Sequence, residues 1–81
     1  MVLHLIRKQW PQAWVLGGRH SVAGIPDLLI CWQGRFIAIE LKRPGESPTP
    51  LQLATLAKIR AAGGEAWVIR YPEELRDVFV A

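Results

Sequence analysis

Glu40 and Lys42 stand two positions apart in the segment 35–42, which is rich in β-branched and other apolar residues. Side chains alternate between the two faces of a β-strand, so this pattern predicts a strand whose carboxylate and ammonium groups project from one face. Taken alone, such a pair is typical of a surface ion pair on an edge strand. Its meaning therefore depends on what the neighbouring strand carries.

Asp27 is the residue that changes this interpretation. It precedes the apolar run 28–32, a second predicted strand, and the intervening Gln33-Gly34 suits a two-residue turn because glycine readily adopts a positive φ. With that turn, Asp27 lies directly opposite Glu40 on the same face, with the β-carbons roughly 4.5–5.5 Å apart. A four-residue loop would keep this pairing, whereas a three-residue loop would shift it by one residue.

Two carboxylates that face each other in this way repel by roughly 3 kcal/mol, taking a separation of about 5 Å and an effective dielectric constant of about 20. A divalent cation converts the repulsion into coordination. Oxygen ligands favour Mg²⁺ or Mn²⁺, which keep positions open for water and phosphate oxygens. Lys42, on the same face, could orient or polarise an attacking water and stabilise negative charge on a phosphate. The pattern therefore predicts a metal-dependent site for phosphate-ester hydrolysis.

The elements that position these residues can be predicted from hydrophobic periodicity and from the Gly and Pro residues between the periodic segments. The order α-β-β-β-α-β-α indicates an α/β (α+β) fold, a small mixed sheet with helices packed on it. The predicted helices span residues 1–10, 50–62 and 72–78, and the predicted strands span 13–16, 28–32, 35–42 and 65–70.

Two finer expectations concern packing. The apolar run 28–32 is continuous, which predicts a central strand covered on both faces, with Cys31 as a packed small hydrophobe. Thr49 and Pro50 are favourable N-cap and first-turn residues for the helix 50–62. From their spacing, we expect four apolar residues of that helix to face the sheet: Leu53, Leu56, Ala57 and Ile59.

Length and composition restrict the class of protein. The chain has 81 residues and a mass of 9.1 kDa, which suits a single domain over residues 1–81 whose small core would benefit from a partner subunit. One cysteine excludes an intrachain disulfide and a cysteine-based metal cluster. No apolar run approaches the length of a membrane-spanning helix, and Arg7 and Lys8 follow the first apolar stretch, the reverse of a signal peptide. We therefore expect a soluble intracellular protein without a membrane partner.

Positive charge is concentrated in the first part of the chain. Residues 1–45 carry six basic and two acidic residues, whereas residues 46–81 carry four basic and five acidic residues. A basic half of this kind attracts phosphates, although a solvated basic face explains the charge equally well. Asp27 and Glu40 are the two acidic residues of the basic half, so their opposed placement needs an explanation of its own.

At this point the motif resembles a known group of enzymes. Pro26-Asp27, followed after twelve residues by Glu40-Leu41-Lys42, resembles the PD-(D/E)xK signature of a nuclease superfamily. The longer string closely resembles the viral replication and repair nuclease (VRR-NUC) family. That string comprises residues 24–29, 39–42 and 49–52 and extends to the predicted strand 66–70, so the resemblance covers most of the chain.

The resemblance implies a restriction-endonuclease-like core and a role for each motif residue. Asp27 and Glu40 would be metal-binding carboxylates, and the main-chain carbonyl of Leu41 would complete the metal shell. Lys42 would be the catalytic lysine, and Gln52, on the first turn of the following helix, would assist positioning. The family cleaves DNA phosphodiesters with Mg²⁺ or Mn²⁺, in settings that include a bacterial cytoplasm or a phage-infected cell.

One departure from the family pattern matters. Many members carry a further acidic residue on the first helix, and here no acidic residue precedes Asp27. The number of metal ions, one or two, is therefore open, and water, His20 or Gln52 could take the remaining place. Candidate DNA contacts are three residues of a glycine-flanked loop and one residue after the lysine: Arg19, His20, Ser21 and Arg43. A plain loop role is the simpler alternative for His20.

From the resemblance we expect a structure-specific DNA endonuclease, a resolvase of four-way (Holliday) junctions that acts as a homodimer. Small family members resemble homodimeric junction resolvases, and symmetric incision requires two sites. A flap, nicking or restriction-like nuclease that uses the same residues is one alternative. A non-catalytic DNA-binding module of the same fold is the other, and the missing helix acid is its main support.

Overall fold

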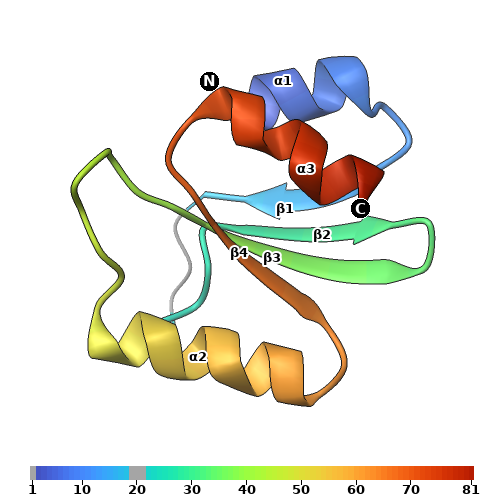
Figure 1. Ribbon diagram of the computed structural model, residues 1–81. Helices are drawn as coiled ribbons and strands as arrows, with labels where there is room; N and C mark the ends of the chain where they lie inside the picture. Colours follow the sequence, from blue (N-terminus) through green and yellow to red (C-terminus); the bar gives the residue numbers. More distant parts are fainter. Residues whose placement is uncertain (1, 19–21) are drawn as a thin grey trace.

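The computed structural model of the protein describes residues 2–18 and 22–81, and it consists of one four-stranded sheet with helices on both faces (Figure 1). The helical elements are α1 (Val2–Gln9), α2 (Pro50–Ala61), the 3-10 turn η1 (Pro72–Glu74) and α3 (Leu75–Val80). The strands are β1 (Trp14–Gly17), β2 (Leu28–Trp32), β3 (Arg35–Leu41) and β4 (Glu65–Ile69). The expected α/β fold and element order are confirmed, with ends that differ by one or two residues.

The strands lie in the order β1-β2-β3-β4. β1, β2 and β3 form antiparallel pairs, whereas β4 runs parallel to β3 because α2 crosses over between them. Gln33 and Gly34 connect β2 to β3 with φ values of 50° and 77°, the left-handed conformation that a tight hairpin turn of matching twist requires. The turn sets Trp32 opposite Arg35 and Leu28 opposite Ile39, which is the register predicted from the sequence.

The main hydrophobic core lies on the face of the sheet that α1 and α3 cover (Figure 1). Trp10, which follows α1, stacks on Phe79 of α3 with ring centroids 4.2 Å apart and an interplanar angle of 8°. The buried members of this core are Ile6, Leu28, Ile30, Ile37, Ile39, Ile69, Leu75, Val78 and Phe79. This layer holds the hairpin and β4 in place.

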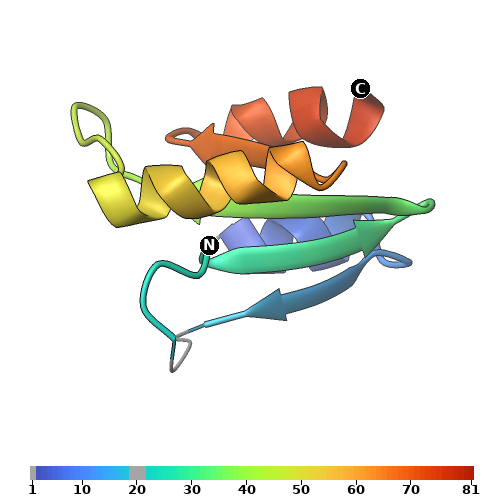
Figure 2. The same cartoon turned by 90° about the horizontal axis from the view of Figure 1, so that it is seen from below.

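The opposite face is only partly covered, and here two sequence expectations are wrong. α2 runs along β3 and β4 and leaves β1 and β2 open (Figure 2). Leu56 is fully buried against the sheet and Ile59 partly, but Leu53 is 51% exposed and Ala57 is exposed. Cys31 is also exposed and not packed, because α2 does not reach the outer half of this face. β2 is an inner strand, as expected, yet only one of its faces is fully covered.

Arg35 ties three elements together at the end of the sheet that carries the hairpin turn. Its Nε and Nη2 donate to the two oxygens of Glu65 on β4, at 2.6 and 2.7 Å. Its Nη2 and Nη1 also donate to the carbonyls of Val78 and Phe79, at 2.5 and 3.4 Å. The guanidinium thus anchors the last turn of α3 to β3 and β4. None of the helices formed by the described residues is long and apolar enough to cross a membrane.

Candidate active site

Asp27 and Glu40 face each other at the end of the β2–β3 hairpin that lies away from the turn. The last paired residues of the ladder are Leu28 and Ile39, so the next step along both strands brings Asp27 opposite Glu40. The Asp27 carboxylate is held in place because its Oδ2 accepts a hydrogen bond from the main-chain N–H of Leu41, at 2.8 Å. The opposition predicted from turn length is therefore present in the fold.

Glu40 is a buried carboxyl group. It is 1% exposed, and among the described residues its Oε2 has no hydrogen-bond partner. The pKa of Glu40 is raised from 4.5 to about 7, and burial is the largest cause. The facing Asp27 carboxylate contributes to this rise in pKa, because its negative charge disfavours a second charge and its oxygens favour a proton shared with Glu40, whereas the positive charge of Lys42 opposes the rise. A buried acceptor that faces a second carboxylate favours either a shared proton or a cation.

The donor set fits a hard divalent cation. Residues of an antiparallel strand direct their N–H and C=O groups toward the same neighbouring strand, so the carbonyl of Leu41 lies on the same side as the N–H that binds Asp27. Two carboxylates and one main-chain carbonyl are oxygen ligands of the type that Mg²⁺ and Mn²⁺ prefer. Within residues 2–18 and 22–81 no cluster of three His, Cys, Asp or Glu side chains is placed to hold a metal. In the described part of the chain, no further acidic side chain therefore joins the pair.

Lys42 extends from the same strand directly after these ligands. Its main-chain N–H donates to the carbonyl of Ile69 at 3.1 Å, which continues the β3–β4 pairing by one residue. The alternation of side chains along the strand places Lys42 on the face of Glu40 and Asp27. The side chain is half-buried, so its ammonium group can reach solvent beside the carboxylates.

α2 begins close to this site, and one glycine makes that proximity possible. Gly24 has a φ of +84°, and a β-carbon built on it would lie 2.8 Å from Cγ of Leu51 and 3.2 Å from Oγ1 of Thr55. A larger residue would push the segment before Asp27 away from the first turns of the helix. This close approach sets Leu51 and Thr55, near the start of α2, against the segment that precedes Asp27.

Gln52 has a structural task in addition to its expected role. The Thr49 N–H donates to Oε1 of Gln52 at 2.9 Å, and the Gln52 N–H donates to Oγ1 of Thr49 at 3.2 Å. This reciprocal capping box satisfies main-chain donors at the helix start. The carboxamide oxygen is therefore engaged, and the carboxamide nitrogen is the group that remains for a ligand.

The expected DNA contacts divide into two groups. Arg43 is exposed immediately after Lys42, and its main-chain N–H donates to Oε1 of Glu46 at 2.9 Å. Arg19, His20 and Ser21 lie outside the residues that the structure describes. Sequence reasoning did not single out Arg70, which follows β4 beside Lys42. Only the β3–β4 register reveals it.

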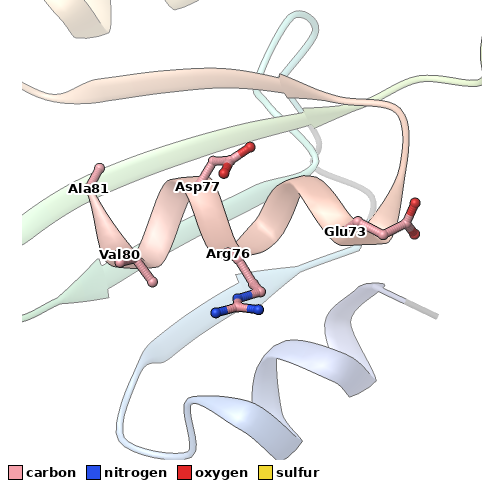
Figure 3. Close-up of a pocket in the computed structure, with 5 residues that line it drawn as sticks. All are labelled: Glu73, Arg76, Asp77, Val80 and Ala81. Atoms are coloured by element: carbon pink, nitrogen blue, oxygen red, sulfur yellow. The ribbon is translucent and has the colours of Figure 1, made fainter.

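The described residues also line pockets away from the carboxylate pair. A pocket of about 610 Å³ is formed along α3, on the opposite face of the sheet from the carboxylate pair. Its lining includes Glu73, Arg76 and Asp77, and Figure 3 shows the side chains of Arg76 and Asp77 pointing to different sides of the helix. Charged groups that diverge in this way do not form a reaction centre. The carboxylate pair, in contrast, is suited to metal binding and hydrolysis.

Comparisons with known proteins identify the family and the fold. The chain is 43% identical over 47 residues to "Putative nuclease p44" of Acyrthosiphon pisum secondary endosymbiont phage 1, a match over 57% of this chain. The chain spans about half the length of that curated relative, since the match covers 50% of it. A solved structure titled "VRR_NUC domain" shares the fold, with a TM-score of 0.77 and 21% identity over 95% of this chain and 88% of that one. The model of the VRR-NUC domain matches residues 2–71, and with most of its length in that match the chain belongs to the VRR-NUC domain family.

Proposed function

We propose that this protein is a metal-dependent DNA endonuclease that hydrolyses phosphodiester bonds. The observation that carries the proposal is the buried, unsatisfied oxygen of Glu40 facing the Asp27 carboxylate, with Lys42 on the same face. A purely structural domain gains nothing from two opposed carboxyl groups in a low-dielectric setting. Membership of the VRR-NUC family supports a nuclease.

In this proposal Asp27, Glu40 and the carbonyl of Leu41 hold Mg²⁺ or Mn²⁺. When bound, the ion supplies Lewis-acid polarisation of the phosphate and lowers the pKa of a water. The Leu41 N–H keeps the Asp27 carboxylate oriented, so little reorganisation is needed when DNA arrives. This arrangement presents the scissile phosphate to Lys42.

Lys42 has the role of placing the nucleophile. Its ammonium group donates hydrogen bonds to the attacking water and to a non-bridging oxygen of the phosphate, so that attack occurs in line with the leaving oxygen. Negative charge grows on the phosphate oxygens as the transition state forms, and a fixed cation beside them lowers its energy. Gln52 contributes its free carboxamide nitrogen to positioning, and Arg43 contacts the DNA backbone. Arg19, His20 and Ser21 are proposed as further backbone contacts.

We further propose that the substrate is branched DNA, with a four-way junction as the preferred form, and that the protein acts as a homodimer. Symmetric incision of a junction requires two related sites. The face that α2 leaves open supports self-association, because it exposes large apolar side chains that a monomer rarely leaves uncovered. These include Trp14 at 60%, Leu16 at 45% and Phe36 at 47% exposure.

The test is cleavage of a panel of labelled DNAs: four-way junction, flap, linear duplex and single strand, each with Mg²⁺, Mn²⁺ or EDTA. Paired symmetric incisions in the junction that disappear in EDTA and in Lys42→Ala would support a dimeric resolvase. Cleavage of the flap or duplex instead would keep the chemistry and replace the substrate. No cleavage of any DNA with either metal would contradict the enzyme proposal.

A non-catalytic DNA-binding module is the second candidate. One observation favours it, namely that within residues 2–18 and 22–81 no third acidic or histidine side chain joins Asp27 and Glu40. DNA binding that is unaffected by EDTA, without cleavage, would select this candidate over the nuclease.

A further inference from the structure

Arg70 lies beside Lys42 at the end of the sheet that carries the carboxylate pair. The parallel β3–β4 ladder pairs Glu40 with Val68 and Leu41 with Ile69, and the bond from Lys42 N to Ile69 O extends it. The next residue on each strand is therefore Lys42 on one and Arg70 on the other. Neighbouring strands are about 4.8 Å apart, so two cationic side chains leave adjacent strands at the same edge of the site.

The charge of Arg70 has no direct acidic partner in the described part of the chain. The only ion pair among residues 2–18 and 22–81 joins Arg35 to Glu65. Arg70 instead donates from Nε and Nη2 to one neutral acceptor, the main-chain carbonyl of Glu46, at 3.2 and 2.7 Å. The nearby Glu74 carboxylate accepts from the main-chain N–H groups of Arg70 and Tyr71, at 2.7 Å each, and not from the guanidinium.

The contact with Glu46 also orients the loop that follows Lys42. Glu46 N–H donates to the carbonyl of Arg43 at 3.0 Å, and Oε1 of Glu46 accepts from Arg43 N–H at 2.9 Å. These bonds close a tight turn, and Arg70 fastens that turn to the end of β4. The main chain of Arg43 and the guanidinium of Arg70 are thus linked through Glu46.

We propose that Arg70 is a phosphate-contacting residue of this site and binds a backbone phosphodiester adjacent to the one being cleaved. Two cations placed side by side repel each other, and an anion between or beside them removes the penalty, as a cation does for the two carboxylates. The hydrogen bonds to Glu46 pre-orient the guanidinium and leave Nη1 for a phosphate oxygen. This inference rests on the proposed function, since it adds a DNA contact to the same site.

Two substitutions separate a charge contact from a structural role. Arg70→Gln keeps a donor for the Glu46 carbonyl and removes the charge, whereas Arg70→Lys keeps the charge and loses the planar fork. Arg60→Ala is the matched control, because Arg60 also donates to a main-chain carbonyl, that of Ala66 at 2.7 Å, near the opposite end of β4. All variants are made in a Lys42→Ala background so that DNA is not cut during binding measurements.

The measurement is the affinity for a labelled four-way junction and a duplex in Mg²⁺, from about 50 to about 200 mM salt, with thermal unfolding recorded in parallel. We expect Arg70→Gln to weaken binding to both DNAs on the order of tenfold and to reduce the slope of log K against log salt by about 0.9. Arg70→Lys should restore the slope, and Arg60→Ala should leave it unchanged.

The outcomes distinguish this inference from the proposed function. If neither wild type nor the Lys42→Ala background protein binds DNA, both the proposed function and the Arg70 contact would be overturned. If the Lys42→Ala background protein binds DNA, and Arg70→Gln in that background shows the same slope of log K against log salt, the Arg70 contact alone would be overturned. Equal losses of affinity and melting temperature in the Gln and Lys variants, with an unchanged slope, would identify a loop-fastening role and equally overturn it.

Discussion

The Leu41 N–H donates a hydrogen bond of 2.8 Å to the carboxylate of Asp27, the residue directly before the neighbouring strand β2. This bond lies where the β2–β3 ladder ends. The Asp27 side chain there accepts the hydrogen bond that a main-chain carbonyl would accept if the ladder continued. It holds Asp27 against β3 and beside the buried Glu40. The site is consequently built into the sheet and does not depend on a mobile loop for its two carboxylates.

Asp27→Asn should abolish metal-dependent cleavage and leave the fold intact. The amide oxygen still accepts from Leu41, but the substitution removes the charge that attracts a cation. Cleavage rates of the preferred DNA, measured across a Mg²⁺ series, should fall by at least about 100-fold. Asp77→Asn, an exposed acidic residue on α3, is the control and should cleave normally. A retained rate in Asp27→Asn would remove this residue from the ligand set.

The raised pKa of Glu40 predicts how the stability of the metal-free protein depends on pH. Because burial and the facing Asp27 together raise that pKa from 4.5 to about 7, the folded state holds a proton that the unfolded chain has released between these values. The free energy of unfolding should therefore fall as pH rises from about 4.5 to about 7. The lowered pKa values of Glu65 and Glu74 act below this window, where acid protonates them.

Glu40→Gln isolates this effect. The variant cannot ionise, so in EDTA it should be more stable than wild type at pH 8, by about 1–3 kcal/mol, and similar to it near pH 4.5. Urea unfolding at both pH values measures the difference. Mg²⁺ should stabilise wild type at pH 8 and leave Glu40→Gln unchanged. Glu73→Gln, at an exposed position, is the control. The prediction would be contradicted if the free energy of unfolding of wild type depended on pH in the same way as that of Glu40→Gln.

Lys42→Ala should separate catalysis from binding. The proposed role of this ammonium group is to place water and stabilise transition-state charge, so its loss should reduce the cleavage rate by about 100-fold or more. Junction affinity, measured by fluorescence anisotropy, should change by less than about tenfold, because other basic residues are also proposed to contact the backbone. Lys58→Ala on the exposed side of α2 is the matched control. Normal cleavage by Lys42→Ala would exclude the lysine from the reaction.

Thr49→Ala and Gln52→Ala together test whether Gln52 does more than cap the helix. Each removes one half of the reciprocal capping box, so each should cost about 1 kcal/mol of stability in urea unfolding. Only Gln52→Ala also removes the carboxamide nitrogen that is proposed to assist positioning at the site. We expect its cleavage rate, compared at a temperature where both variants are folded, to be lower than that of Thr49→Ala. Equal rates would restrict Gln52 to the cap.

Arg35→Gln should destabilise the protein without altering the chemistry. The guanidinium bonds Glu65 and the last carbonyls of α3, far along the sheet from Asp27 and Glu40. Loss of these partly exposed bonds should lower the free energy of unfolding by about 1–2 kcal/mol. At low temperature, cleavage per folded molecule should match wild type. Arg76→Gln, which lies exposed on α3, should change neither quantity.

The sequence by itself determined the central feature of the site. The opposition of Asp27 and Glu40 follows from a two-residue turn and from the alternation of side chains, and both are properties of neighbouring residues in the chain. The N-terminal cap of α2 and the order of elements could be predicted for the same reason. Local geometry and periodicity leave few alternatives for a tight hairpin and a capped helix.

Only the tertiary structure decided how the layers cover one another. α2 covers the β3–β4 side of its face, where Ala38 and Ala66 are buried, and Cys31 and Leu53 are exposed although their sequence pattern predicts burial. The β3–β4 register spans a crossover helix, and packing across that distance, not a turn, selects it. That register is what brings Arg70 beside Lys42, a contact between parts of the chain that no local pattern connects.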